Sequence, residues 1–206
     1  MHKEILTPSQ MNLLAFIKKF GDNFYMAGGT SIALQIGHRR SIDFDLFTKA
    51  ESLDTVKIKS AFMKLNGSGK SIIYEAFDQI HFFVDGVKIT FFTYPFDIKT
   101  NISFEGICNM PNLATLGAMK TFALGGRNKW KDYVDLYFIL RDHCTLEILM
   151  KEAEEIFKES FNPKLFRGQL TYFDDVDYSE SVEYIGPEIS DDIVKGFLTN
   201  IATSKI

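Results

Sequence analysis

Residues 25–47 of this 206-residue chain read YMAGGTSIALQIGHRRSIDFDLF, and they carry its clearest structural signals. A short apolar run at 24–27 ends at a pair of glycines, and residues 32–36 then follow helical spacing. The segment 41–47 alternates apolar side chains with two carboxylates, which is typical of a strand with one apolar and one acidic face. The stretch therefore predicts a strand, a glycine turn, a short helix and a second strand.

The glycine turn has the residue types of a phosphate-binding site. Gly28 and Gly29 allow the backbone to approach a phosphate closely, and the free N–H groups at a helix start favour negative charge. Thr30 or Ser31 is expected to cap the helix, and their hydroxyls can add hydrogen bonds. A lone double glycine is more often a tight turn, so the motif is informative only in combination.

The second half of the combination is the pair Asp43 and Asp45. Residues i and i+2 of a strand point the same way, which places the two carboxylates roughly 6–7 Å apart at the backbone. Both can reach the same divalent ions, and this suits Mg²⁺ bound to a nucleoside triphosphate. Alone the pair would indicate the solvated face of an edge strand. Only twelve residues, 31–42, separate it from the glycine turn, and the combination favours a nucleotide site.

Beyond this stretch the pattern predicts strands in the first half of the chain and helices in the second half. Asp85-Gly86 between two apolar runs indicates a hairpin. We therefore expect an α+β fold with an α/β core at 1–110 and a helical region at 111–206 packed on it. The expected strands are 71–76, 79–84 and 87–94, and the expected helices are 8–20, 53–65, 113–124, 132–141, 145–161, 163–173 and 189–201.

Composition narrows the function classes. The chain carries 23 basic and 27 acidic residues, a formal net charge of −4, so a polyanionic partner needs a local basic patch. Cys108 and Cys144 are too few for a disulfide scaffold, which favours a reducing compartment, and they form no CxxC pair of the kind that indicates zinc or redox chemistry. No apolar run reaches the roughly 18 residues that a membrane span needs, and no leader pattern begins the chain. We expect a cytoplasmic protein without a membrane segment.

Two stretches, 25–34 and 38–47, closely resemble the AbiEii/AbiGii toxin family of the polymerase-β-like nucleotidyltransferase superfamily. Lys120 and the segment 131–136, KDYVDL, resemble the later motifs of that family, a lysine-bearing helix followed by a (R/K)D-x-x-D-L helix. The resemblance covers roughly residues 20 to 140. It implies a polymerase-β-like nucleotidyltransferase core, a mixed sheet flanked by helices, followed by a C-terminal helical region.

The resemblance also implies an activity and roles for residues. The protein would move a nucleoside monophosphate from a triphosphate to a hydroxyl. The implied acceptor is RNA, and the 3′ end of tRNA is the favoured one. It would be the toxin of a toxin–antitoxin or phage-defence pair with a separate antitoxin protein. The resemblance implies nucleotide phosphates on Gly29, Thr30 and Ser31, Mg²⁺ or Mn²⁺ on Asp43 and Asp45, and a pocket completed by Lys120, Lys131 and Asp135.

One position departs from the superfamily, whose members usually carry a third carboxylate on a later strand. In the segment 87–92 that position is Thr90, and a hydroxyl is a weak ligand and no base at neutral pH. Two alternatives therefore stay open. The same chemistry could act on a small molecule such as an aminoglycoside, or the chain could bind nucleotide without transferring it.

Several charged residues have two interpretations from sequence alone. His38, Arg39 and Arg40 suit either phosphate contact or a solvated turn, and with Arg127, Lys129 and Lys131 the two arginines could form a basic rim. Lys120 either reaches the surface or points at triphosphate. Asp135 lies among apolar residues and needs a partner, either Lys131 or Lys120. The acidic stretch 174–183 is expected to be a solvated loop.

Overall fold

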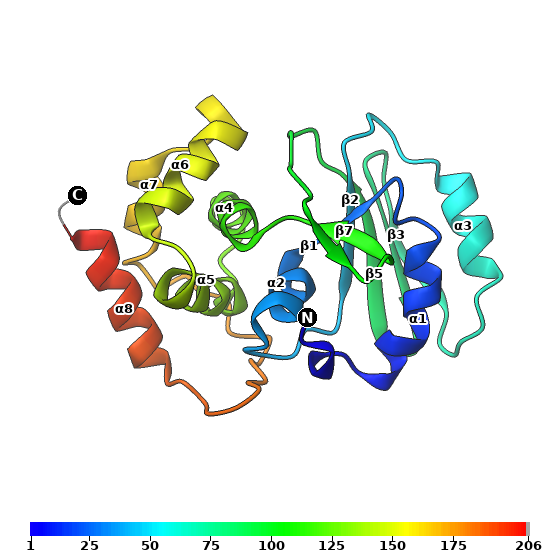
Figure 1. The fold of residues 1–206 in the computed structure, drawn as a ribbon, viewed down its shortest axis with the longest axis horizontal. Coiled ribbons are helices and arrows are strands. Elements are labelled where there is room, and N and C mark those ends of the chain that lie inside the picture. Colours follow the sequence, from blue (N-terminus) through cyan, green and yellow to red (C-terminus); the bar gives the residue numbers. More distant parts are fainter. Residues whose placement is uncertain (205–206) are drawn as a thin grey trace.

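The computed structural model describes residues 1–204, which form a seven-stranded mixed sheet with helices on both sides (Figure 1). The strand order is β3-β4-β5-β2-β1-β7-β6, with β2 parallel to β5 and antiparallel to β1. This mixed α+β architecture confirms the expected fold class. The strands are β1 (Tyr25–Ala27), β2 (Phe44–Thr48), β3 (Ser71–Glu75), β4 (Gln79–Val84), β5 (Val87–Thr93), β6 (Ile102–Phe104) and β7 (Cys108–Met110).

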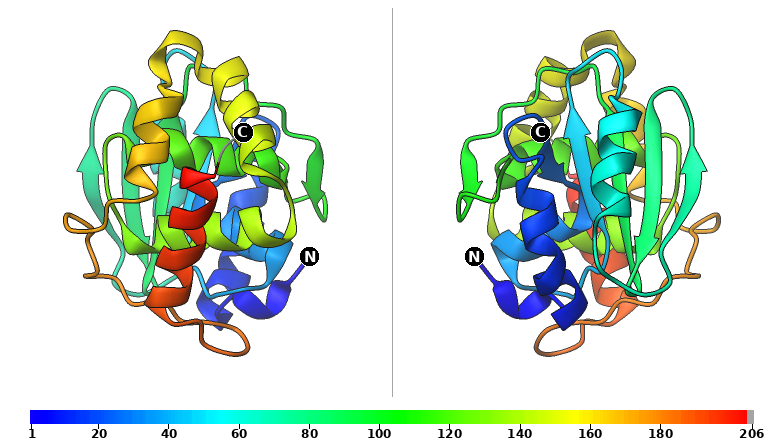
Figure 2. Two further views of the ribbon diagram at one scale, coloured as in Figure 1. Left: turned by 90° about the vertical axis from the view of Figure 1, so that its left-hand side faces the viewer. Right: turned by 90° about the vertical axis from the view of Figure 1, so that its right-hand side faces the viewer.

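The helices form two groups on either side of α2. Helices α1 and α3 cover one side of the sheet, and α4 to α8 gather on the opposite side (Figures 1 and 2). The expected helical region 111–206 begins with α4, and its last two residues lie outside the described part. The helices are α1 (Pro8–Lys18), α2 (Gly28–Ile36), α3 (Thr55–Met63), α4 (Leu113–Leu124), α5 (Trp130–Asp142), α6 (Leu146–Phe157), α7 (Pro163–Gln169) and α8 (Asp191–Thr203), with 3₁₀ turns at Lys3–Ile5 and Lys158–Ser160.

Local sequence signals explain several element boundaries. The Thr7 hydroxyl accepts a hydrogen bond from the Gln10 backbone N–H at 3.2 Å, and the Gln10 side chain accepts one from the Thr7 N–H at 3.0 Å. This reciprocal pair is a capping box and fixes the start of α1. Asp85 and Gly86 have φ of 51° and 81°, as a two-residue hairpin turn between β4 and β5 requires.

The helix after the glycine turn begins earlier than expected. Its first residue is Gly28 and its N-cap is Ala27, which has no side-chain cap, so the prediction that Thr30 or Ser31 caps it is wrong. Both hydroxyl residues lie instead inside the first turn. Strand β2 begins later than expected, at Phe44, so Asp43 directly precedes the strand. The three-residue strands β6 and β7 were not predicted, because so short a segment carries no measurable periodicity.

The core has two parts that meet at β1 and α2. One cluster joins apolar side chains of α1, α3 and the sheet, such as Phe16, Phe62 and Phe91. The other joins the second-half helices. Met26 of β1 packs in the first cluster, whereas the next residue, Ala27, packs in the second. The strand and helix formed by residues 25–36 therefore lie at the boundary between the two cores. No helix within residues 1–204 has the length and apolar character to cross a bilayer.

Candidate active site

Asp43 and Asp45 lie at the start of β2, on the side of the sheet that faces α4 and α5. Asp45 lies on β2 in register with Ala27 of β1 and Thr90 of β5. The Asp43 carboxylate is 3.1 Å from the Lys88 Nζ. Burial, and then the neighbouring charge of Asp43, raise the pKa of Asp45 above its usual value, and no hydrogen bond within the described residues offsets this. A divalent cation would relieve the repulsion.

Gly28 brings the glycine turn into contact with this pair. Its φ is +70°, and a Cβ built there would lie 2.4 Å from the Asp45 Oδ2. Only glycine fits, because an added methyl group would be strained and would displace the carboxylate. The N-terminus of α2, with its unpaired N–H groups and no side-chain cap, therefore begins directly beside Asp45.

The hydroxyl side chains of the turn face the protein interior. Thr30 is buried, and its hydroxyl bonds to the Ser41 Oγ at 2.9 Å and to the carbonyl oxygen of Asp43. Ser31 is also fully buried. Thr30 thus ties α2 to the segment that carries Asp43. The roles of Thr30 and Ser31 in phosphate binding stay a prediction, and their backbone N–H groups, not their hydroxyls, are the groups suited to it.

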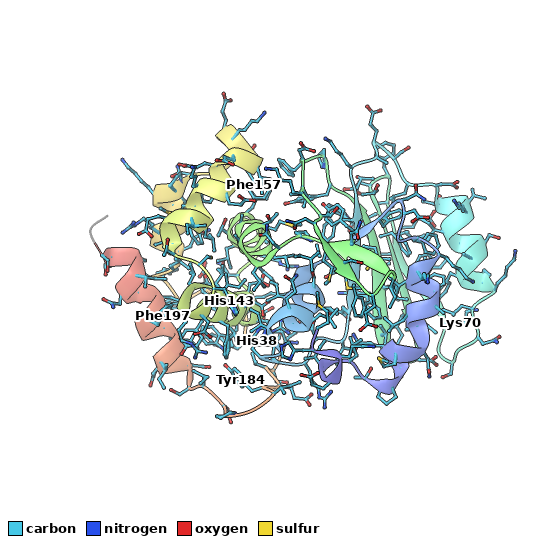
Figure 3. The ribbon with its side chains drawn as sticks, in the orientation of Figure 1. His38, Lys70, His143, Phe157, Tyr184 and Phe197 are labelled. Atoms are coloured by element: carbon cyan, nitrogen blue, oxygen red, sulfur yellow. The ribbon has the colours of Figure 1, made fainter. Side chains whose placement is uncertain are left out.

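Behind the turn lies a buried charge cluster centred on Asp135 of α5, near His38, which lies between α2 and α5 (Figure 3). The Arg39 guanidinium donates to both carboxylate oxygens at 2.8 and 2.9 Å, His38 Nε2 bonds at 2.8 Å, and the Lys120 ammonium lies 2.9 Å away. Lys120 also pairs with Asp132. Arg39 and Lys120 hold the pKa of Asp135 well below its usual range despite its burial.

The cluster settles three interpretations that the sequence left open. A solvated turn is wrong for His38 and Arg39, which are 4% and 2% exposed. Lys120 is buried and does not reach the surface, and burial alone would lower its pKa, but Asp132 and Asp135 hold that pKa above the usual value. Asp135 is paired with Lys120 and not with Lys131. Asp135 is fully buried, both of its carboxylate oxygens accept hydrogen bonds from Arg39, and it lines neither the charged nor the apolar cavity.

A polar cavity of about 260 Å³ opens in front of the aspartates. Of the predicted site residues, it brings together Gly29, Asp43, Asp45, Lys120 and Lys131. The cavity is not lined by the buried residues Thr30, Ser31 and Asp135. It is not lined by Arg40 either, whose side chain pairs with Glu183 at 2.6 Å. The cavity walls also include Arg127, which was expected in the basic rim, and three residues that were not named for the site from the sequence, Lys88, Asp132 and Glu180.

Two of these omissions had a signal in the sequence. Lys88 precedes Thr90 by two positions on β5, so it faces the same side of the sheet as Asp45. Asp132 is the first acid of the KDYVDL segment and is 2% exposed between Lys120 and Arg127. Glu180 carried no such signal, because its approach depends on the path of the C-terminal half.

The acidic stretch 174–183 is a mostly exposed loop, which confirms its prediction as a solvated loop, and it lies along the basic rim. Glu180 pairs with Lys129 and, at 3.3 Å, with Lys131. The backbone is fixed at one end by the Trp130 N–H, which donates to the Asp177 carbonyl at 3.0 Å. At the other end, the Arg40 N–H donates to the Glu183 carbonyl at 2.8 Å. Acidic side chains of the same chain therefore neutralise most of the positive charge of the basic rim.

A second, mostly apolar cavity of about 310 Å³ adjoins the first. Lys120 and Arg127 line both. Its other walls include Gly28 and apolar or aromatic side chains from the sheet and from α4, namely Phe47, Tyr94, Leu116, Met119, Phe122 and Ala123. The two cavities together therefore present a charged compartment next to an aromatic one.

The donor set at the aspartates fits a magnesium ion. Within the described residues, no third His, Cys, Asp or Glu side chain completes a metal-binding group. Mg²⁺ is commonly held by one or two carboxylates together with substrate phosphates and waters, so Asp43 and Asp45 suffice. The position where a third carboxylate was expected is Thr90, which is 9% exposed and lies beside Asp45 on the neighbouring strand.

A carboxylate pair beside a glycine turn and a helix start, on a mixed sheet backed by a helical half, defines a nucleotidyltransferase fold. Residues 13–181 match the family described as nucleotidyl transferase AbiEii toxin, type IV toxin–antitoxin system. The chain belongs to this AbiEii family, which confirms the resemblance seen in its motifs.

Relatives and solved structures agree with this assignment. An uncharacterised protein of Aquifex aeolicus, aq_aa25, is 30% identical over 190 residues, which span 87% of this chain and 90% of that protein. MenT4, a nucleotidyltransferase toxin of Mycobacterium tuberculosis, superposes with a TM-score of 0.61 at 12% identity, covering 95% of this chain and 80% of its own. JHP933 of Helicobacter pylori gives a TM-score of 0.59 at 16% identity, covering 96% and 91%. These structural likenesses show the fold.

Proposed function

We propose that this protein transfers a nucleoside monophosphate from a Mg²⁺-bound triphosphate to an RNA hydroxyl, with the tRNA 3′ end as acceptor, and releases pyrophosphate. In the cell it would act as the toxin of a toxin–antitoxin pair in phage defence, neutralised by a separate antitoxin protein. The observation that carries the proposal is the unpaired, half-buried Asp45 carboxylate beside Asp43 at the start of α2.

The charged cavity suits the triphosphate. The α2 N-terminus offers backbone N–H groups at Gly29, and Lys120 and Lys131 supply positive charge from the helical half. Asp43 and Asp45 would hold the divalent cation, which neutralises charge on the phosphates when bound. The chain itself then mainly positions donor and acceptor. Mn²⁺ would suit the same two carboxylates.

The apolar cavity suits the nucleoside. Phe47, Tyr94, Met119 and Phe122 offer stacking and packing surfaces, and Lys120 and Arg127 connect this cavity to the charged one. Purine and pyrimidine rings both have faces that stack on aromatic side chains. We therefore place the donor base in this cavity and the phosphates beside Asp43 and Asp45.

An RNA acceptor is supported by local charge. Although the whole chain has a net charge of −4, the charged cavity is lined by six basic and four acidic side chains, a local surplus of two positive charges. The acceptor backbone would meet this local field and not the field of the whole protein. The six basic residues are Arg39, Lys88, Lys120, Arg127, Lys129 and Lys131.

The test is transfer of label from each of the four α-phosphate-labelled triphosphates to total tRNA, with and without Mg²⁺. Asp45→Asn should lower transfer by about a hundredfold or more, since charge stabilisation of this kind is worth several kcal/mol. The matched control is Asp97→Asn, whose carboxylate is 89% exposed and pairs with Lys49. Label that is independent of Asp45 or of Mg²⁺ would contradict the proposal. Bound nucleotide without any transfer would favour the binding-only alternative.

A further inference from the structure

We propose that His81 of β4 is the catalytic base that accepts the proton of the attacking acceptor hydroxyl, one strand beyond the position where a third carboxylate was expected. The inference rests on the proposed function. A base is needed because Thr90, which stands where a carboxylate was expected, cannot take a proton at neutral pH.

The sheet places His81 on the same face as the aspartates. Asp45 of β2 is in register with Thr90 of β5, and Thr90 is in register with His81 of β4. Side chains of residues paired across neighbouring strands point to the same face. Two strand spacings of about 4.8 Å put the His81 backbone roughly 10 Å from that of Asp45, with the small Thr90 between them. In this proposal the acceptor hydroxyl lies between the imidazole and the aspartates.

The ring of His81 is held in one tautomer. Its Nε2 lies 2.8 Å from the side-chain oxygen of Gln79, two residues earlier on the same face of β4. An amide oxygen only accepts, so Nε2 carries the hydrogen and Nδ1 keeps its lone pair. The Tyr74 ring from β3 packs against the imidazole with centroids 5.2 Å apart. Within residues 1–204 no protein group bonds to Nδ1, which is therefore available to a substrate.

The charges around His81 favour its neutral form. Burial and the positive charge of Lys88 on β5 lower its pKa, while the more distant Asp45 opposes this. Tyr74 is the facing titratable group from β3, and Thr90 on β5 carries no charge. The imidazole can therefore accept a proton at neutral pH.

The carboxylates that line the charged cavity are less suited to this step. Asp132 lies between Lys120 and Arg127, Glu180 pairs with Lys129 and Lys131, and Asp43 pairs with Lys88. A carboxylate held by a cation is a weaker base. Asp45, the carboxylate without a partner, has the role of metal ligand in the proposed function.

Nucleotidyl transfer to the acceptor forms one bond to phosphorus and breaks another. The acceptor O–H bond breaks and its proton moves to His81 Nδ1, while the oxygen forms a bond to the α-phosphorus. The bond from the α-phosphorus to the bridging oxygen breaks, and pyrophosphate leaves with that electron pair. The imidazolium then returns its proton to water. No oxidant, reductant or further reactant is needed.

The experiment measures the single-turnover rate of transfer from an α-labelled triphosphate to total tRNA between pH 5.5 and 9. For the wild type we expect a rate that rises with pH through one ionisation and then levels. His81→Gln should lower the rate at pH 7.5 by about 10² to 10⁴, the usual contribution of a general base, and should lose that ionisation. Its nucleotide affinity and melting temperature should match the wild type. The control is His143→Gln, at the exposed end of α5.

A second variant, Gln79→Leu, should lower the rate less than His81→Gln and keep the ionisation, because the base remains but its tautomer is no longer fixed. An unchanged pH profile in His81→Gln would overturn the inference, as would a rate loss matched by an equal loss of nucleotide affinity. Failure of the proposed function would give a different result, because the wild type itself would then transfer no label to tRNA.

Discussion

Among single residues, the buried Asp135 carboxylate is expected to affect the free energy of unfolding strongly. It neutralises Arg39 and Lys120 in the interior, and both cations would be left short of a partner without it. Asp135→Asn should therefore lower the free energy of unfolding at pH 7 by about 3–5 kcal/mol, the range found when one partner of a buried ion pair is removed. Urea unfolding of the variant and of Glu155→Gln, an exposed control, measures this.

The same residue sets a pH dependence with a definite sign. The pKa of Asp135 is held well below its usual range in the folded state, mainly by Arg39 and Lys120 against burial. The stabilisation is therefore complete above the unfolded-state pKa, about 3.9, and is lost as pH falls from there toward the folded-state pKa. The difference between wild type and Asp135→Asn should shrink below about pH 4. A constant difference down to pH 2.5 would contradict this.

At the scale of elements, the start of α2 couples backbone conformation to the site. Gly28→Ala places a methyl group at φ +70° and 2.4 Å from the Asp45 Oδ2. We expect transfer to fall by about a hundredfold, because displacing a catalytic group by 1 Å can cost that much. Stability should fall by about 1–2 kcal/mol, the cost of the left-handed conformation.

Gly196 of α8 is the matched control for this change, because nothing lies within 4 Å of a Cβ built there. Gly196→Ala should keep full transfer and gain up to about 1 kcal/mol of stability from helix propensity. Transfer rates and melting curves of both variants decide the prediction. Full activity in Gly28→Ala would show that the close approach to Asp45 has no functional role.

At the scale of the whole molecule, the C-terminal half returns to the site through the acidic stretch 174–183. Glu180 pairs with Lys131, which the triphosphate would use, and with Lys129 of the same cavity. Glu180→Gln should therefore lower the KM for the triphosphate several-fold and make it more sensitive to salt, since freed charges are screened. Glu183→Gln, which unpairs only Arg40 outside the cavity, should leave KM unchanged. An equal effect of both variants would contradict the prediction.

The strand, glycine turn, helix and strand of residues 24–47 were predicted from sequence because periodicity and glycine conformation are local properties, although α2 begins earlier and β2 later than predicted. The sequence also predicted the family, the α+β class and the aspartate pair. The burial of His38 and Arg39 on Asp135, and the contact of Glu180 with the basic rim, depend on how distant segments pack against one another. Only the sheet register decided that His81 shares a face with Asp45. The residues brought together in this way lie 36 to 97 positions apart, and local pattern carries no information on which distant side chains will meet when two cores pack together.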